Sequence, residues 1–262
     1  MNFQISAAGL QYGSPRKYAS LLFLLFATML LIASNSFAAH PLITDDTGTQ
    51  GSGKFQIEVN AEYANSGGDS ETGLNVTLSA GVRDNLDFVI SPPYQFLRTK
   101  TSSETFTDDG ISDIPIELKW RFYEKDGLSF AIKPGIILPT GDEDKGLGDG
   151  KPSYSLFFIT TKEVDPVTFH LNLGYIKNGT ELRDIWLYSL AAEYRVTKPL
   201  RIVANIGGET NPDRESDTHP LFILGGFIYS IGEAFDFDAG LKAGLNKAEA
   251  DYALLAGITF RF

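Results

Sequence analysis

Cysteine is absent from this chain of 262 residues, and histidine occurs only three times, as His40, His170 and His219. A chain without cysteine has no disulfide framework, no thiol nucleophile and no thiolate metal site. A membrane-embedded hydrolase would need Ser and His together on a lipid-facing surface. His170 instead lies on the inward-facing side of its predicted strand, residues 167–177. We therefore expect no catalytic site, no metal or cofactor site, and no enzymatic activity.

Positive charge is also scarce, with 22 Lys and Arg against 33 Asp and Glu, for a net charge of −11. Loss of Arg16 and Lys17 with the leader described below would leave −13. Binding to nucleic acid depends on clustered Lys and Arg that neutralise phosphates. The composition therefore excludes nucleic acid as the expected partner.

Long hydrophobic runs are missing except at residues 19–33, which follow Arg16 and Lys17 and end before the small residues Ser36 and Ala38. This layout is typical of a secretory signal peptide, and we expect residues 1–38 to be removed after Ala38. The alternative, a membrane anchor, needs about 20 apolar residues, and this run is shorter. The chain is therefore expected to be exported to the periplasm.

From Lys54 onwards apolar and polar residues alternate, beginning with Phe55, Ile57 and Val59 against Gln56 and Glu58. Alternation with a period of two predicts strands between two unlike environments. Twelve such segments follow, each about long enough to cross a bilayer as a tilted strand: 54–63, 71–82, 86–97, 111–123, 128–139, 152–162, 167–177, 184–196, 199–209, 220–231, 234–244 and 251–262.

Short and long links alternate between these segments, as in the up-and-down hairpins of an outer-membrane β-barrel. We therefore predict an all-β fold: residues 54–262 form a transmembrane barrel of twelve antiparallel strands whose first and last strands pair. A soluble sandwich or lipocalin-like barrel is the alternative. Charges in the middle of the polar faces and aromatic residues near strand ends favour the membrane barrel. The side chains expected to face lipid include Leu78, Leu118, Ile132, Leu171 and Leu241.

The residues of opposite parity are expected to line the lumen, where acids and bases would pair because an isolated buried charge is costly. The candidate solute path consists of Glu58, Glu62, Asp113, Glu117, Lys119, Arg121, Lys133, His170, Arg195, Arg201, Asp236, Asp238 and Lys242. Charges that only fill and stiffen the barrel are an equally good interpretation. Apolar residues of the same parity, such as Phe157 and Phe222, suit a small, partly apolar solute.

Residues 39–53 precede the first strand and are expected to lie in the periplasm or to fold into the lumen as a plug. Lys119, Arg121 and Lys133 share inward parity on adjacent strands and are predicted to form a basic cluster. This cluster would attract an anionic aromatic such as a benzoate, or hold Asp45 and Asp46 of the plug.

Proline occurs at similar depth in three consecutive segments, as Pro92, Pro93, Pro115 and Pro134. Proline cannot donate a hydrogen bond to a β-ladder, so these positions predict bulges or gaps. A lateral opening into the lipid is one interpretation. We favour local bends.

Three stretches form recognisable motifs: HPLITDDTGTQG at 40–51, GISDIPIELKWRF at 110–122, and LPTGD at 138–142 with GLGDG at 146–150. With these motifs the chain resembles a family of outer-membrane transporters associated with the MetA (meta-cleavage) pathway of phenol degradation. The resemblance implies an outer-membrane barrel that takes up small aromatic or hydrophobic compounds, and it assigns no functional residues.

We expect the protein to be a passive channel for small solutes. The alternatives are a structural or adhesive barrel with a closed interior and, least favoured, a membrane-embedded hydrolase. The expected partners are outer-membrane lipid and lipopolysaccharide, the barrel-assembly machinery during insertion, and a small-molecule solute.

Overall fold

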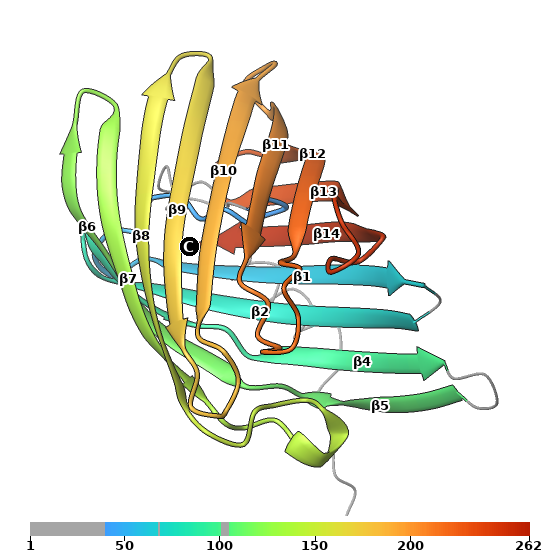
Figure 1. The fold of residues 1–262 in the computed structure, drawn as a ribbon. Coiled ribbons are helices and arrows are strands. Elements are labelled where there is room, and N and C mark those ends of the chain that lie inside the picture. Colours follow the sequence, from blue (N-terminus) through green and yellow to red (C-terminus); the bar gives the residue numbers. More distant parts are fainter. Residues whose placement is uncertain (1–39, 68, 101–104) are drawn as a thin grey trace, which may run out of the picture.

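The computed structural model describes residues 40–67, 69–100 and 105–262. The predicted signal peptide, residues 1–38, lies outside the described residues. Figure 1 shows strands that curve around a common interior, with the segment from residue 40 to 53, in blue, running through that interior. None of the helices in the described part of the chain is long and apolar enough to cross a bilayer.

The strands follow one another around the wall with few other elements between them. One short 3-10 helix, η1, covers Glu143–Lys145. The strands are β1 Phe55–Ser66, β2 Asp69–Arg83, β3 Leu86–Ile90, β4 Pro93–Lys100, β5 Thr105–Ile111, β6 Ile114–Lys125, β7 Leu128–Leu138, β8 Ser153–Val164, β9 Val167–Lys177, β10 Ile185–Arg195, β11 Leu200–Glu209, β12 Leu221–Ile231, β13 Phe235–Gly244 and β14 Tyr252–Arg261.

The wall closes because β1 pairs antiparallel with β14, from Gln56 opposite Arg261 to Asn65 opposite Tyr252. Every other strand also pairs antiparallel with its neighbours. Two of the twelve predicted strands are interrupted. β3 and β4 together take the place of one strand in the wall, and β5 and β6 together take the place of another. β2 pairs with both β3 and β4, while β6 pairs with β3 and β5 pairs with β4. The predicted closed barrel of twelve antiparallel strands is confirmed.

Proline explains the interruption between β3 and β4. Pro92 stands between the two strands and has no N–H to donate, but its carbonyl still accepts from the Val76 N–H at 3.3 Å. Pro115 and Pro134 remain in register, opposite Ile137 and Leu156. The prolines therefore interrupt a strand at one position and are accommodated within strands elsewhere.

Two predicted loops are shorter than expected. The loop expected at 98–110 is largely strand, since β4 continues to Lys100 and β5 begins at Thr105, and the loop expected at 64–70 is a tight hairpin between β1 and β2. These strand ends project beyond the apolar belt, where no face must be hydrophobic. The alternation that marks a membrane strand is therefore absent from them.

The outer surface is an apolar belt. Leu78, Leu118, Leu171 and Leu241 are between 40% and 53% exposed, as expected for side chains that face lipid. Ile132 is only half-buried, because it stands between Trp120 and Phe158 on the adjacent strands. Exposed aromatic rings lie towards the strand ends at Tyr63, Tyr123, Tyr154, Trp186, Tyr194, Tyr229 and Tyr252. An apolar exterior around a polar interior is the architecture of an outer-membrane barrel.

Leu118 lies near the middle of β6, so replacing it by Arg should destabilise the barrel by roughly 2 to 4 kcal/mol, because the charge would face the hydrocarbon. Tyr123→Arg, near the periplasmic turn of the same strand, should cost about 0 to 1 kcal/mol. Urea unfolding of the protein in lipid vesicles measures both. Equal costs would contradict the assigned membrane position.

Candidate functional site

The segment from His40 to Gly53 enters the barrel at the end that carries the short turns, which is the periplasmic end by the usual topology. There the Gly53 N–H donates to the Gly81 carbonyl at 2.8 Å. At its other end the His40 Nδ1 atom lies 2.5 Å from Asp238 Oδ1 on β13. The segment contains no helix or strand and lies across the lumen between these two attachments.

Glycines on the inner face make room for the segment. A Cβ on Gly240 would lie 2.9 Å from the Cβ of Pro41, and a Cβ on Gly257 would lie 2.6 Å from His40 Nδ1. A Cβ on Gly81 would overlap the Gly51 carbonyl. Leu42 joins a buried apolar cluster with inward residues of β10 to β12 and β14, including Val203 and Phe222. On this side the segment is held by shape complementarity together with the contact between His40 and Asp238.

Backbone groups of the segment are satisfied by polar side chains of the wall. Asn205 Oδ1 on β11 accepts from the N–H groups of Ile43 at 2.8 Å and Thr44 at 3.2 Å. The Thr47 N–H donates to Thr161 Oγ1 at 3.1 Å, and the Thr47 hydroxyl lies 2.5 Å from that of Ser129. These bonds fasten an irregular chain to strands on both sides of the lumen.

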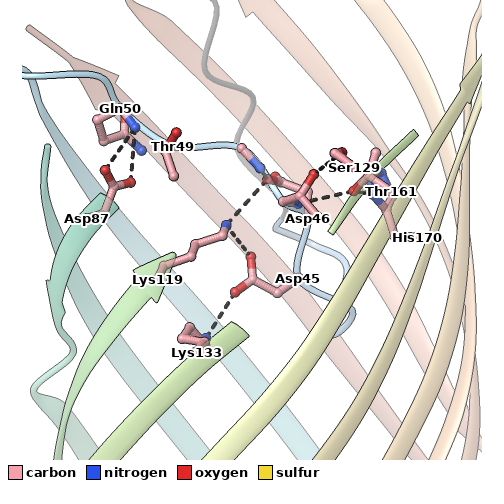
Figure 2. A network of polar contacts seen from close by, with 12 residues as sticks. Asp45, Asp46, Thr49, Gln50, Asp87, Lys119, Ser129, Lys133, Thr161 and His170 are labelled. Atoms are coloured by element: carbon pink, nitrogen blue, oxygen red, sulfur yellow. Dashed lines mark hydrogen bonds and ion pairs between the residues drawn. The ribbon is translucent and has the colours of Figure 1, made fainter. Parts of the chain in front are cut away.

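Two lysines bind the acidic pair of the segment (Figure 2). The Lys119 ammonium on β6 lies 2.9 Å from Asp45 Oδ1 and 3.3 Å from Asp46 Oδ1. The Lys133 ammonium on β7 lies 2.9 Å from Asp45 Oδ2 and 3.3 Å from Glu117 Oε2. Burial alone would raise the pKa of the Asp45 carboxyl, but Lys119 and Lys133 outweigh it and hold that pKa well below its usual range.

The predicted basic cluster needs one correction. Arg121 does not join Lys119 and Lys133, and instead pairs with Glu124 of its own strand at 3.1 Å, in the periplasmic mouth. The ladder between β6 and β7 shifts register between Arg121 and Tyr123. The strict alternation of inward and outward side chains therefore does not continue through this point. The carboxylate beside Arg121 therefore belongs to Glu124 of the barrel wall and not to the segment.

A second ionic network joins the periplasmic half of the wall. Glu193 contacts His170 at 3.3 Å and Arg201 at 2.7 Å, and Asp236 contacts Arg201 at 3.4 Å and Arg261 at 2.8 Å. These five side chains are all buried. They connect strands from β9 round to β14, so their evident effect is to hold the wall together.

The remaining predicted path residues have various contacts. Lys242 pairs with Glu62 at 3.0 Å and with Glu249 at 3.3 Å, near the outer end of the lumen. Glu58 accepts from Gln56 Nε2 at 2.5 Å. Asp113 accepts from the N–H groups of Gly141 and Asp149, so it anchors an outer loop, and Arg195 pairs with Asp165 at an exposed turn. That these side chains guide a solute stays a prediction.

The segment divides the lumen. A central chamber of about 430 Å³ lies along the inner faces of β1 to β3 and β6 to β8, and two outer chambers of about 420 and 240 Å³ adjoin it. A periplasmic vestibule of about 280 Å³ lies on the other side. Asp46 and Gly48 line both the central chamber and the vestibule. Residues 46–48 therefore form the partition between them.

Several of these residues were not singled out from the sequence. Asn205 is an isolated polar residue of inward parity, and Glu249 lies in an outer loop, so neither gives a periodic signal. Three inward glycines did offer one, since Gly226 and Gly240 are register partners on adjacent strands and Gly257, on the next strand, is opposite Asp238, two residues from Gly240. A row of inward glycines indicates that another part of the chain approaches the wall closely.

Comparison with family models gives a match over residues 38–262 to the family described as "Putative MetA-pathway of phenol degradation". The chain belongs to this family. Comparison with curated proteins finds no match.

Solved structures resemble this member of the phenol-degradation family in fold. The COG4313 outer membrane channel from Pseudomonas putida F1 has a TM-score of 0.65 at 12% identity, covering 83% of this chain and 98% of that one. The NanC porin has a TM-score of 0.56 at 10% identity, covering 78% and 98%. A KdgM porin in complex with disordered oligogalacturonate has a TM-score of 0.55 at 8% identity, covering 79% and 99%.

The chain contains no cysteine, so an engineered pair reports the position of the segment directly. Thr47→Cys with Ser129→Cys should form a disulfide under mild oxidation, because the two hydroxyls lie 2.5 Å apart. Thr47→Cys with Ser189→Cys, on the inner face of β10, should remain reduced. A shift in gel mobility after oxidation distinguishes them. Equal cross-linking of both pairs, or of neither, would contradict the docked position.

Proposed function

We propose that the protein is a passive diffusion channel of the outer membrane for small solutes, with its passage restricted by residues 40–53. The observation that carries the proposal is the partition at Asp46, Thr47 and Gly48. Hollow space lies on both sides of these residues, and only an irregular, non-covalently held segment separates the two spaces. A barrel with a purely structural role needs no such chambers.

The solute class follows from the lining and from the family. Ile43 is 44% exposed inside the lumen, and with Phe157, Leu187 and Phe222 it gives one outer chamber an apolar side. Such a surface suits a small aromatic or hydrophobic compound, in agreement with the phenol-degradation family description. Passive permeation is supported by the structural neighbours, which are an outer membrane channel and two porins.

The proposal includes no catalysis. Of the three histidines, His40 is bonded to Asp238, His170 lies between Thr161 and Glu193, and His219 accepts from the Asn211 N–H in an outer loop. Each holds structure together. We place the protein among lipid and lipopolysaccharide, inserted by the barrel-assembly machinery, with the solute as its ligand.

Displacing the segment should increase conductance across planar bilayers. Deletion of residues 40–51 removes the partition, and Gly240→Val should expel Pro41, the nearest group to its new side chain. Gly225→Val on β12 is the matched control, because a Cβ there meets nothing within 4 Å. We expect higher conductance for the first two proteins and wild-type conductance for the control.

A closed structural barrel is the second candidate, favoured by the dense ion pairs around Lys119 and Lys133. It predicts that wild type, deletion and Gly240→Val are all silent. That result would remove the channel proposal.

A further inference from the structure

The charge in the outer part of the lumen is strongly unbalanced. The central chamber is lined by five acids, Asp45, Asp46, Glu58, Asp87 and Glu117, and by the basic residues Lys119, Lys133 and His40, the last of which is bonded to Asp238. The two outer chambers add four acids, Glu62, Glu71, Glu209 and Glu249, and one base, Lys242. Nine carboxylates therefore face three lysines along the route above the partition.

The three lysines are already engaged by protein carboxylates. Each ammonium contacts two acidic side chains within 3.3 Å: Lys119 with Asp45 and Asp46, Lys133 with Asp45 and Glu117, and Lys242 with Glu62 and Glu249. An entering anion would have to displace one of these partners and leave it uncompensated, which is costly in a confined space.

Four of the acids are not within ion-pair distance of any base that the structure describes: Glu58, Asp87, Glu71 and Glu209. Glu58 accepts from Gln56 and Glu71 from Gln95, both through neutral side-chain amides, while Asp87 accepts from the backbone of Gln50. Their negative charges therefore act on whatever occupies the chambers. A lumen lined by one sign of charge raises the local concentration of ions of the opposite sign.

A second, independent feature lies at the waist where the central chamber meets the larger outer chamber. Asn60 and Asn75 line both chambers and are register partners, and Asp238, Gly257 and Asn60 follow one row across β13, β14 and β1. The side-chain oxygens Asn60 Oδ1, Asn75 Oδ1 and Asp238 Oδ2 are buried without a hydrogen-bond donor in the described structure. Asp238 itself is fully buried.

Gly257 leaves a cradle between two of these oxygens. A Cβ at that position would lie 2.6 Å from Asn60 Oδ1, from Asp238 Oδ2 and from His40 Nδ1, and His40 bonds the other carboxylate oxygen of Asp238. Buried acceptors without donors are costly, and an ammonium group or a partly dehydrated monovalent cation supplies what they lack. Carbonyl and carboxylate oxygens in a narrow passage are the groups that channels use to replace a cation's hydration shell.

We propose that the lumen selects cations over anions, with the side-chain oxygens of Asn60 and Asn75 as the waist site for a monovalent cation or the ammonium group of a small aromatic amine. The proposal rests on the channel function proposed above and narrows its solute class. It disfavours benzoate-like anions, which an unoccupied basic cluster would have attracted.

Bilayer recordings of the full-length mature protein under a KCl gradient give the reversal potential and hence the ratio of K⁺ to Cl⁻ permeability. We expect K⁺ to be favoured several-fold. Glu58→Gln with Glu71→Gln should lower that ratio several-fold, and Asn60→Ala with Asn75→Ala should reduce K⁺ conductance. Glu215→Gln, an exposed carboxylate of the outer loop between β11 and β12, is the control and should leave the ratio unchanged.

Vesicle uptake of phenethylamine and phenylacetate, two aromatic ions of similar size and opposite charge, tests the solute class, with faster entry expected for the amine. Three results would overturn the selectivity while leaving a conducting channel. They are a K⁺ to Cl⁻ permeability ratio at or below unity, faster entry of phenylacetate than of phenethylamine, and a permeability ratio that is unchanged in the Glu58 and Glu71 double variant. Absence of conductance in wild type and in the 40–51 deletion would instead refute the channel itself.

Discussion

The ion pairs between Asp45 and the lysines of β6 and β7 are the constraint on which the interior depends. Lys119 and Lys133 are carried into the lumen by strand parity, because their neighbours Leu118 and Ile132 must face lipid. A buried ammonium without a partner would cost several kcal/mol. Asp45 contacts both lysines at 2.9 Å, so the segment supplies the compensating charge that the wall lacks. The lysines of the wall therefore fix the position of the segment, and the segment neutralises the lysines of the wall.

Two different kinds of fit fasten the segment. Towards β6 and β7 it is held by charge, through Asp45 and Asp46. Towards β12 to β14 it is held mainly by shape, because inward glycines admit His40 and Pro41 while Leu42 enters an apolar cluster, and His40 adds a contact with Asp238. Ile43 lies between the two attachments and remains exposed to the lumen. The segment thus both fills the barrel and forms part of the surface that a solute would meet.

The sequence predicted the features that follow from strand periodicity. The twelve wall positions, the pairing of the first and last strands and the lipid-facing leucines all depend on a two-residue repeat imposed by lipid on one side and a polar lumen on the other. Features without a repeat were not predictable in the same way. The β4 and β5 extensions leave the membrane, where alternation ends, and Arg121 follows a register shift that parity cannot reveal. The role of Asn205 depends on the path of an irregular chain that only the folded wall defines.

Exchange of the charges tests the central account most directly, with single-channel conductance as the measurement. Asp45→Lys should open the passage, because three ammonium groups would then face one another beneath the segment. Lys119 and Lys133 also pair with Asp46 and Glu117, so the matching variant reverses the whole network, with Asp46→Lys and Glu117→Lys added to Asp45→Lys, Lys119→Glu and Lys133→Glu. This combined variant restores opposite charges at every contact and should return conductance towards the wild-type level. Conductance that is unchanged by Asp45→Lys, or that stays high in the combined variant, would contradict the view that these ion pairs hold the segment across the lumen.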